Sequence, residues 1–259
     1  MFFIKKQVNK PFLEQSVCHT DFHSHILPEV DDGSKSVEES LLMLRMSAEQ
    51  GVKRIVATPH FYAHKDNIDD FLCRRDAALD ILKNAIREDA DNFSEYPEIY
   101  VGAEVLYFPG ISRSDSIKNL CIRGTNMLIL EMPFIQWDDK TLEEVFTIKD
   151  NLGIIPIVAH IDRYFRIQTM DILAKLFEQE VLIQANADGI ISPATRKKTL
   201  KLILDEKVDF LGSDCHSSSE RKPNLFEACE IILKKNGQSF IDGINDFSSF
   251  VFNEVEKEI

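Results

Sequence analysis

The feature that most constrains this sequence is the alternation of short β-rich runs with longer helical patterns along its 259 residues. Runs rich in branched and aromatic residues predict strands at Val17–Phe22, Arg54–Thr58, Ile99–Val105, Met127–Glu131, Ile154–Ala159, Val181–Ala185 and Asp209–Ser213. The segments between them have helical patterns at Val37–Gln50, Ile68–Glu88, Leu142–Asn151, Met170–Glu178, Pro193–Leu204 and Leu225–Lys235. Strands that alternate with helices in this way predict a parallel sheet.

Local signals support several of these predicted helices. Ser36 to Glu39 fits a capping box at a helix start, and Pro193 suits the first turn of its helix. The connection Leu106–Asn126 is only weakly helical, and no Pro-, Gly- or Ser-rich linker divides the chain. The simplest expectation is one domain over residues 1–259, folded as a closed or nearly closed (β/α) barrel.

Composition excludes several classes of protein. The formal net charge of −13 disfavours nucleic acid as a partner, because binding it relies on Lys and Arg. No run of about 18 apolar residues predicts a membrane span, and no cleavable leader is evident, so we expect a cytoplasmic protein. The five cysteines are scattered without a Cys-x-x-Cys pair, which indicates neither a disulfide framework nor a zinc knuckle.

Chemistry-bearing residues gather at the carboxyl ends of the predicted strands. Five of the seven histidines follow a strand; they are His23, His25, His60, His160 and His216. Four acidic residues share these places, namely Asp32, Glu104, Glu131 and Asp214. Because the carboxyl ends of barrel strands converge on one face, these side chains would line one mouth. His19 and His64 fall outside the pattern and are expected to be structural or surface residues.

These residue types predict bound metal ions. His23 and His25 lie two apart, so on an extended segment both point to the same side, and Asp214 with His216 repeats the spacing. Imidazole with carboxylate favours Mn²⁺, Fe²⁺ or Zn²⁺ over Ca²⁺. The candidate ligands exceed what one ion needs, so two or three ions fit better.

The motifs that contain these residues resemble the PHP (polymerase and histidinol phosphatase) superfamily. They are Asp21–Pro28, Val30–Ser34, Ala57–His60, Gly102–Glu104, Leu130–Met132, Val158–Tyr164 and Gly212–His216. The Asp-Asp-Gly block and the His-x-x-Arg-Tyr block are most similar to the bacterial protein-tyrosine phosphatases encoded with capsule and exopolysaccharide genes. Residues 1–20 extend beyond the usual start of that branch and include the lead into the first strand.

The resemblance implies a distorted seven-stranded TIM-like barrel, (β/α)7, with three divalent ions at the C-terminal strand ends. Manganese is favoured, with iron, zinc or magnesium as alternatives. By position, one ion would lie among His23, His25, Glu104 and Asp214. Glu104 would bridge to a second ion with Glu131 and His160, and a third would take Asp32, His60 and His216. Arg163 and Arg221 match the arginines that face the substrate.

The implied activity is metal-dependent hydrolysis of phosphotyrosine on a bacterial tyrosine kinase that regulates capsular or exopolysaccharide synthesis. A hydroxide between metals would be the nucleophile, since bound metal lowers the pKa of water to about 7. Two alternatives stay open: a small-molecule phosphatase with a substrate such as histidinol phosphate, and a non-catalytic metal-binding module of a polysaccharide export system. Homo-oligomerisation is also left open.

One motif points to different chemistry. Cys215 and Arg221 have the Cys-x5-Arg spacing of cysteine-dependent tyrosine phosphatases, in which a thiolate attacks phosphorus. The intervening segment lacks glycine, and Glu220 would oppose a phosphate. We therefore expect the metal mechanism rather than the cysteine mechanism.

Overall fold

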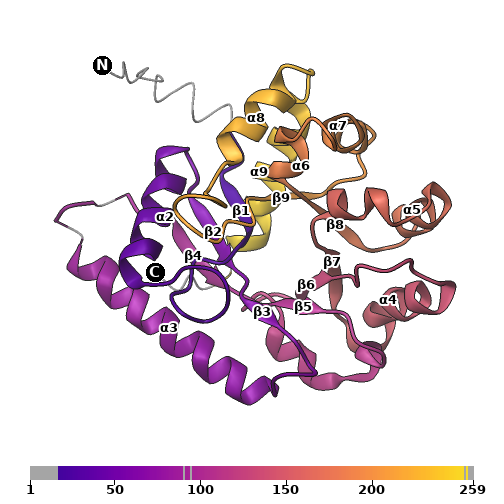
Figure 1. Cartoon of the computed structure of the whole chain (residues 1–259), viewed down its shortest axis with the longest axis horizontal. Helices are drawn as coiled ribbons and strands as arrows, with labels where there is room; N and C mark the ends of the chain where they lie inside the picture. Colours follow the sequence, from indigo (N-terminus) through magenta and orange to yellow (C-terminus); the bar gives the residue numbers. More distant parts are fainter. Residues whose placement is uncertain (1–16, 90, 94, 254, 256–259) are drawn as a thin grey trace.

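The computed structural model describes residues 17–89, 91–93, 95–253 and 255. Strands occupy the middle of the molecule and helices surround them (Figure 1). Most of the predicted 1–20 extension lies outside the described residues. None of the described helices is long and apolar enough to cross a membrane.

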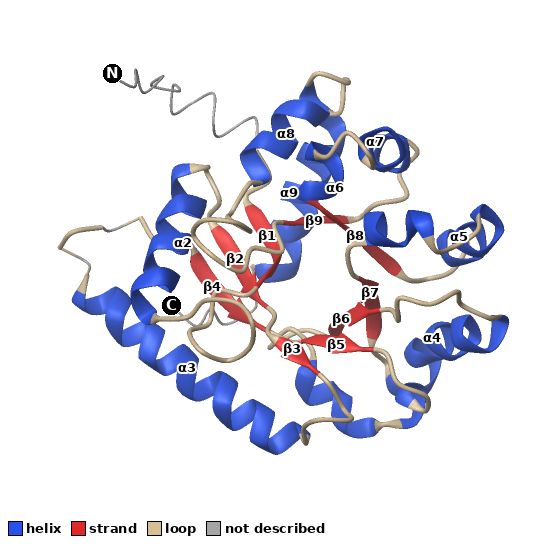
Figure 2. Ribbon diagram, in the orientation of Figure 1, coloured by secondary structure: helices blue, strands red, loops and turns tan. Residues whose placement is uncertain are grey.

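The strands all pair in parallel, as the alternating pattern predicts. They are β1 (Thr20–Ser24), β2 (Arg54–Ala57), β3 (His60–Phe61), β4 (Glu98–Val101), β5 (Glu104–Leu106), β6 (Met127–Glu131), β7 (Ile155–Val158), β8 (Leu182–Asn186) and β9 (Phe210–Gly212). Three of them form a sheet in the order β1-β2-β4, and six form another in the order β3-β5-β6-β7-β8-β9. The prediction of an α/β fold built on parallel strands is thereby confirmed, and Figure 2 shows the strands curling within the ring of helices.

Of two neighbouring predicted strands, one is confirmed and the other is wrong as a continuous element. The predicted strand Arg54–Thr58 is β2, and a separate short strand, β3, follows Pro59, which has no N–H for a ladder. The predicted strand Ile99–Val105 is divided into β4 and β5 at Gly102 and Ala103. The chain stays paired across both breaks: the Gly102 N–H donates to the Ala57 carbonyl at 2.9 Å, and the Glu104 N–H donates to the Pro59 carbonyl at 3.0 Å. The two neighbouring strands are therefore interrupted at adjacent positions and remain hydrogen-bonded to each other there.

The two sheets also meet through β1 and the segment after β9. The Asp214 N–H donates to the His23 carbonyl at 2.8 Å, and the His25 N–H donates to the Cys215 carbonyl at 2.9 Å. The first strand is thus tied to the last one, and the residues that these bonds fix are candidate metal ligands.

The helices are α2 (Val37–Glu49), α3 (Ile68–Glu88), α4 (Asp139–Leu152), α5 (Met170–Phe177), α6 (Ala187–Ile191), α7 (Arg196–Leu204), α8 (Leu225–Leu233) and α9 (Gln238–Phe252). Short 3-10 helices occur at η1 (Ile111–Arg113), η2 (Asp115–Leu120) and η3 (Ile161–Arg166). The first two account for the weakly helical connection. Sequence patterns did not predict α6 or α9, and Pro193 lies in a turn before α7 rather than in its first turn.

The start of α2 follows only half of the predicted capping box. The Ser36 side chain accepts a hydrogen bond from the Glu39 N–H at 3.2 Å, as predicted. The Glu39 carboxylate instead accepts from the Lys35 N–H at 3.0 Å and from the Ser218 N–H at 3.1 Å. Glu39 therefore ties α2 to the loop that carries Arg221.

A buried apolar cluster joins the strands to α9. Phe22, Tyr100 and Phe210, from β1, β4 and β9, belong to it together with Phe252. The Phe252 ring lies 4.2 Å from the Tyr100 ring and 5.8 Å from the Phe22 ring, centroid to centroid. The last described helix thus packs its end against three strands.

Phe252→Ala is expected to lower the free energy of unfolding by about 3 kcal/mol, because it removes a buried aromatic ring and leaves a cavity. Urea denaturation followed by circular dichroism measures the change. Phe250→Ala on the same helix is the matched control, since Phe250 is 78% exposed, and it should change stability by no more than about 0.5 kcal/mol. Equal effects of the two substitutions would contradict the packing described.

Candidate metal centre

The candidate ligands come from strand ends and the loops that follow them. Glu131 is the last residue of β6, His160 follows β7, and Asp214 and His216 follow β9. Three positions differ from the prediction: His23 lies inside β1, His60 inside β3, and Glu104 begins β5 instead of ending a strand. The strand breaks at Pro59 and Gly102 account for the last two, because each break starts a new strand at the site.

The first group surrounds one oxygen of Glu104. Glu104 Oε2 lies 3.2 Å from His23 Nε2 and 3.3 Å from His25 Nε2. Asp214 Oδ1 lies 3.8 Å and 3.4 Å from the same two nitrogens. Ligand atoms about 2.0–2.2 Å from one ion lie roughly 3.0–3.5 Å from one another. These four side chains therefore have the spacing of ligands around one ion.

Two further groups adjoin the first. Glu104 Oε1 lies 2.8 Å from His160 Nε2, which is 3.6 Å from Glu131 Oε1. On the other side, Asp32 Oδ1 lies 3.5 Å from both His60 Nε2 and His216 Nε2. His60 also reaches Glu104, with Nδ1 2.9 Å from Oε2. Glu104 is thus the common member around which the groups are arranged.

Some buried polar atoms in the cluster have no hydrogen-bond partner. One of them is His216 Nε2, which lies 3.5 Å from Asp32 Oδ1. Leaving such an atom unsatisfied costs about 1–3 kcal/mol, which a divalent cation between the donors would offset. Imidazole nitrogens and carboxylate oxygens are ligands of Mn²⁺, Fe²⁺ and Zn²⁺, so the residues fit such ions.

The protonation states of Glu104, His160 and His216 also suit metal binding. Burial would raise the pKa of the Glu104 carboxyl, but the neighbouring His23 charge and hydrogen bonds from histidines lower this pKa well below its usual range. Glu131 differs, because burial and the Glu104 charge raise its pKa to about 7, so a cation beside it would have to displace a proton. Burial and the His25 charge lower the pKa of His216 to about 4, and burial lowers the pKa of His160. Ionised carboxylate and neutral imidazole are the forms that bind metal.

His23 and His25 behave differently. Burial would lower their pKa, but the acidic neighbours Glu104 and Asp214 raise it for both imidazoles. A cation among these four side chains would replace the protons that the carboxylates otherwise favour.

Three supporting residues were missed by sequence reasoning. Asp31 Oδ2 accepts the His25 Nδ1–H at 2.7 Å, which leaves His25 Nε2 facing Glu104, and it accepts the His60 N–H at 2.9 Å. Gln184 Oε1 accepts the His160 N–H at 2.6 Å, and Asn186 Nδ2 donates to Asp214 Oδ2 at 2.8 Å. The sequence signals for these supporting residues are the adjacent pair Asp31-Asp32 and the two amide side chains in β8, a strand that is otherwise apolar.

Two candidate ligands have strained backbone. His160 has φ of 37° and Asp214 has φ of 53°, both in the left-handed region. This conformation costs a non-glycine residue about 1–2 kcal/mol and is concentrated at functional sites. Gln184 and the His23 carbonyl bind the two backbone N–H groups and hold the conformations.

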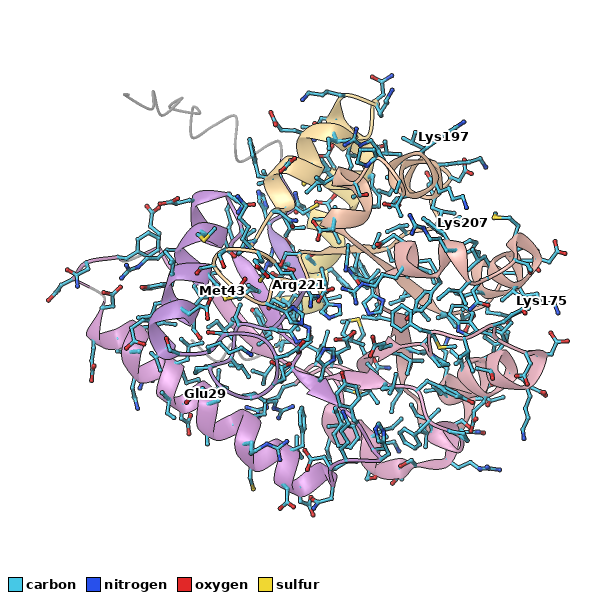
Figure 3. The ribbon with its side chains drawn as sticks, viewed as in Figure 1. Glu29, Met43, Lys175, Lys197, Lys207 and Arg221 are labelled. Atoms are coloured by element: carbon cyan, nitrogen blue, oxygen red, sulfur yellow. The ribbon has the colours of Figure 1, made fainter. Side chains whose placement is uncertain are left out.

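Both predicted arginines reach the cluster through Asp214. Arg163, from η3, forms an ion pair with Asp214 Oδ2, and Arg221 Nη2 lies 2.8 Å from the same oxygen. Their side chains are 33% and 39% exposed, so both also face solvent. Figure 3 shows Arg221 near the middle of the molecule, whereas Lys175 and Lys197 lie at its edge. The structure thus brings together all eleven residues singled out in the sequence, whereas His64 is exposed and His19 half-buried.

Cys215 is not placed as a nucleophile. Its side chain is fully buried in an apolar cluster with Ile26 and Met43, and burial raises the pKa of its thiol. A catalytic cysteine needs an accessible thiolate of lowered pKa. The Ser217 hydroxyl accepts the N–H groups of Glu220 and Arg221 at 3.2 Å each, so these amides are already engaged.

The fold and the cluster define a parallel α/β protein with a histidine- and carboxylate-rich site of the kind that holds divalent metals. The family model described as "Capsular polysaccharide synthesis, CpsB/CapC" matches residues 19–247. The chain therefore belongs to the CpsB/CapC family, which confirms the resemblance to capsule-locus phosphatases.

Individual relatives agree with this assignment. A putative tyrosine-protein phosphatase CapC of Staphylococcus aureus is 32% identical over 208 residues, which cover 78% of each chain. The tyrosine-protein phosphatase YwqE of Bacillus subtilis is 27% identical, over 84% of this chain and 85% of that protein. A solved structure from work on YwqE and on CpsB of Streptococcus pneumoniae, described as metal-dependent tyrosine phosphatases, has a TM-score of 0.76 at 20% identity. It covers 92% of this chain and 96% of that one.

Asp31→Asn is expected to weaken manganese binding by roughly 10- to 100-fold, because it removes the charged acceptor that orients His25. Isothermal titration calorimetry with Mn²⁺ measures the change. Glu38→Gln, at an exposed position at the start of α2, is the control of equal charge change and should leave the affinity unaltered. An Asp31→Asn protein with wild-type affinity would show that Asp31 does not support the site.

Proposed function

We propose that this protein is a metal-dependent protein-tyrosine phosphatase. The observation that carries the proposal is the convergence of three adjoining groups of candidate ligands, two of which share Glu104, with two arginines paired to Asp214. We also infer that the strands form a single distorted seven-stranded (β/α) barrel with the site at their C-terminal ends. Its support is that β2 with β3, and β4 with β5, each continue one strand across a short break.

Three divalent ions, with manganese favoured, are the proposed cofactors. His23, His25, Glu104 and Asp214 would hold the first; Glu104, Glu131 and His160 the second; and Asp32, His60 and His216 the third. Such ions lower the pKa of a coordinated water and so supply a hydroxide nucleophile at neutral pH. Three ions, four carboxylates, one hydroxide and two arginines leave a local charge of about +3, which suits a phosphate dianion.

The chain's own residues bind and orient the phosphate group. Arg163 and Arg221 each present a planar guanidinium, which can bind two phosphate oxygens at once. Both are anchored on Asp214, so they approach the phosphate from the same side. Tyrosine phenolate, of pKa about 10, leaves readily, so a strong acid is not required.

The substrate class follows from the relatives named as tyrosine-protein phosphatases. We propose that the substrate is phosphotyrosine on a bacterial tyrosine kinase that regulates capsular or exopolysaccharide synthesis, in the cytoplasm. The net charge of −13 is consistent with a partner other than nucleic acid.

Removal of metal is the direct test. The manganese-loaded protein should hydrolyse a phosphotyrosine peptide faster than histidinol phosphate, and chelation should abolish the activity until Mn²⁺ is restored. Initial rates of phosphate release measure both, and elemental analysis gives the metal content. Cys215→Ser should retain turnover. Activity that survives complete metal removal but is lost in Cys215→Ser would disprove the mechanism, and a preference for histidinol phosphate would disprove the substrate.

His160→Ala and Asp214→Ala should each lower kcat/KM on the phosphotyrosine peptide by roughly 100-fold or more, because each removes a metal ligand. Circular dichroism should show that both variants stay folded. Phe250→Ala again serves as the control and should keep the wild-type rate. Near wild-type rates in both ligand variants would contradict the site assignment.

A further inference from the structure

A groove with basic walls runs along α7 on the outer surface of the molecule. Its volume is about 670 Å³, and its floor is apolar, with Leu200 buried and Leu204 50% exposed. We call this feature the α7 groove. Of the described residues that line it, one is acidic, Asp205, and four are cationic, namely Arg196, Lys197, Lys201 and Lys235.

Two of the four cations are already engaged within the protein. Arg196 donates to two backbone carbonyls at the end of α6, and Lys201 Nζ lies 2.9 Å from Asp205 Oδ2. Lys197 and Lys235 are exposed, and within the described part of the chain neither forms an ion pair. Figure 3 shows Lys197 at the edge of the molecule. These two ammonium groups are therefore available to a ligand.

The positive charge of the α7 groove is an exception in an acidic chain, whose net charge is −13. A groove between α2 and α3 has a similar apolar component, Leu41 and Ile81, and a volume of about 530 Å³, but Glu38, Glu88 and Asp89 line it. An acidic ligand is repelled by the protein as a whole and attracted at the α7 groove. Charge of this kind determines where a ligand binds, and the apolar floor adds affinity.

The first turn of α7 adjoins η3, the element that carries Arg163. Lys198 Nζ donates to the carbonyl of Phe165, which lies two residues beyond Arg163, at 3.4 Å. The nine residues of α7 make a helix about 13 Å long, and four residues of extended chain span about the same length. A segment of a protein ligand that lies over η3 can therefore continue along the α7 groove for about four residues.

We propose that the α7 groove binds an acidic segment of the protein substrate, with carboxylates on Lys197 and Lys235 and an apolar side chain on Leu204. This inference rests on the proposed phosphatase function and deepens it, because it names what the substrate carries besides phosphotyrosine. Two exposed ion pairs correspond to about a 2- to 30-fold gain in affinity. Because the groove contacts lie outside the reacting groups, they should lower KM and leave kcat unchanged.

The surroundings of the α7 groove favour a peptide over an anionic membrane. The groove is concave, so its apolar floor does not reach the acyl chains of a flat bilayer. Asp205 and Glu206, which follow α7, are exposed and would face the lipid headgroups. The net charge of −13 adds repulsion from a negatively charged leaflet. An extended acidic segment fits the groove and places its carboxylates on the lysines.

Kinetics with three phosphotyrosine peptides test this inference on the manganese-loaded full chain. The first is short and has uncharged flanks, the second adds Glu-Leu-Glu-Glu beyond a flexible Gly-Ser linker, and the third replaces that acidic block with Gly-Ser at equal length. The block is placed before the phosphotyrosine in one set and after it in another. In one of the two sets the acidic peptide should have a KM at least threefold below that of its equal-length counterpart, at the same kcat.

Substitutions locate the contact. Lys197→Glu should remove the KM difference, and Leu204→Asp should reduce it, while both variants hydrolyse the short peptide at the wild-type rate. Lys53→Glu, at an exposed lysine outside the groove, is the control of equal charge change and should keep the difference. Sedimentation with vesicles of phosphatidylserine and phosphatidylcholine tests the membrane as the occupant, and the wild-type chain should not bind them.

A KM difference below threefold in both sets, with the short peptide hydrolysed normally, would overturn the docking role while leaving the phosphatase function standing. A difference that persists in Lys197→Glu would overturn it too, because the acidic contact would then lie elsewhere. Binding to the vesicles that Lys197→Glu abolishes would assign the groove to a membrane instead. If the wild-type chain hydrolyses none of the peptides, the proposed function fails and the docking role fails with it.

Discussion

The buried carboxylate of Glu104 is the constraint on which the rest of the structure depends. An ionised carboxylate that is only 1% exposed is costly unless opposite charges or hydrogen-bond donors surround it. Imidazoles from β1, β3 and the segments that follow β1 and β7 supply that environment, at 2.8–3.3 Å from its two oxygens. Elements far apart in the sequence must therefore meet at the start of β5. Because the carboxylate needs cations or donors on every side, the same requirement that organises the fold creates a place for divalent metals.

The backbone adopts unfavourable local conformations where these elements converge. His160 and Asp214 adopt left-handed conformations, and β9 ends at Gly212, where an added Cβ would lie 2.5 Å from the His23 Cβ. Glycine there lets β9 approach β1 closely enough for the Asp214 N–H to reach the His23 carbonyl. These features follow from the ligand geometry and would be unfavourable in a fold without the site.

Sequence patterns predicted the regular strands and helices of this protein and missed its local irregularities. Alternating strand and helix signals predicted the parallel α/β fold, and the rule that strand ends converge predicted which histidines and acids lie together, whereas Arg163 and Arg221 came from the family resemblance. The break at Gly102 was missed because it falls inside an apolar run that is typical of one continuous strand, and β3 was missed because two residues after a proline are too short to show a strand pattern. Asp31 and Gln184 were missed because an acidic pair and an amide in an apolar strand identify supporting residues only after their ligand partners are placed.

Asp214 connects the cluster of candidate ligands to the two arginines. Its Oδ1 faces His23 and His25, whereas its Oδ2 accepts Arg163, Arg221 and Asn186. One carboxylate therefore links both guanidinium groups to the ligand cluster. A protein with net charge −13 cannot attract a phosphorylated segment through its overall field. Under the proposed function, recognition would depend on charges arranged within a few ångströms, and Asp214 would hold both arginines beside the candidate metal ligands.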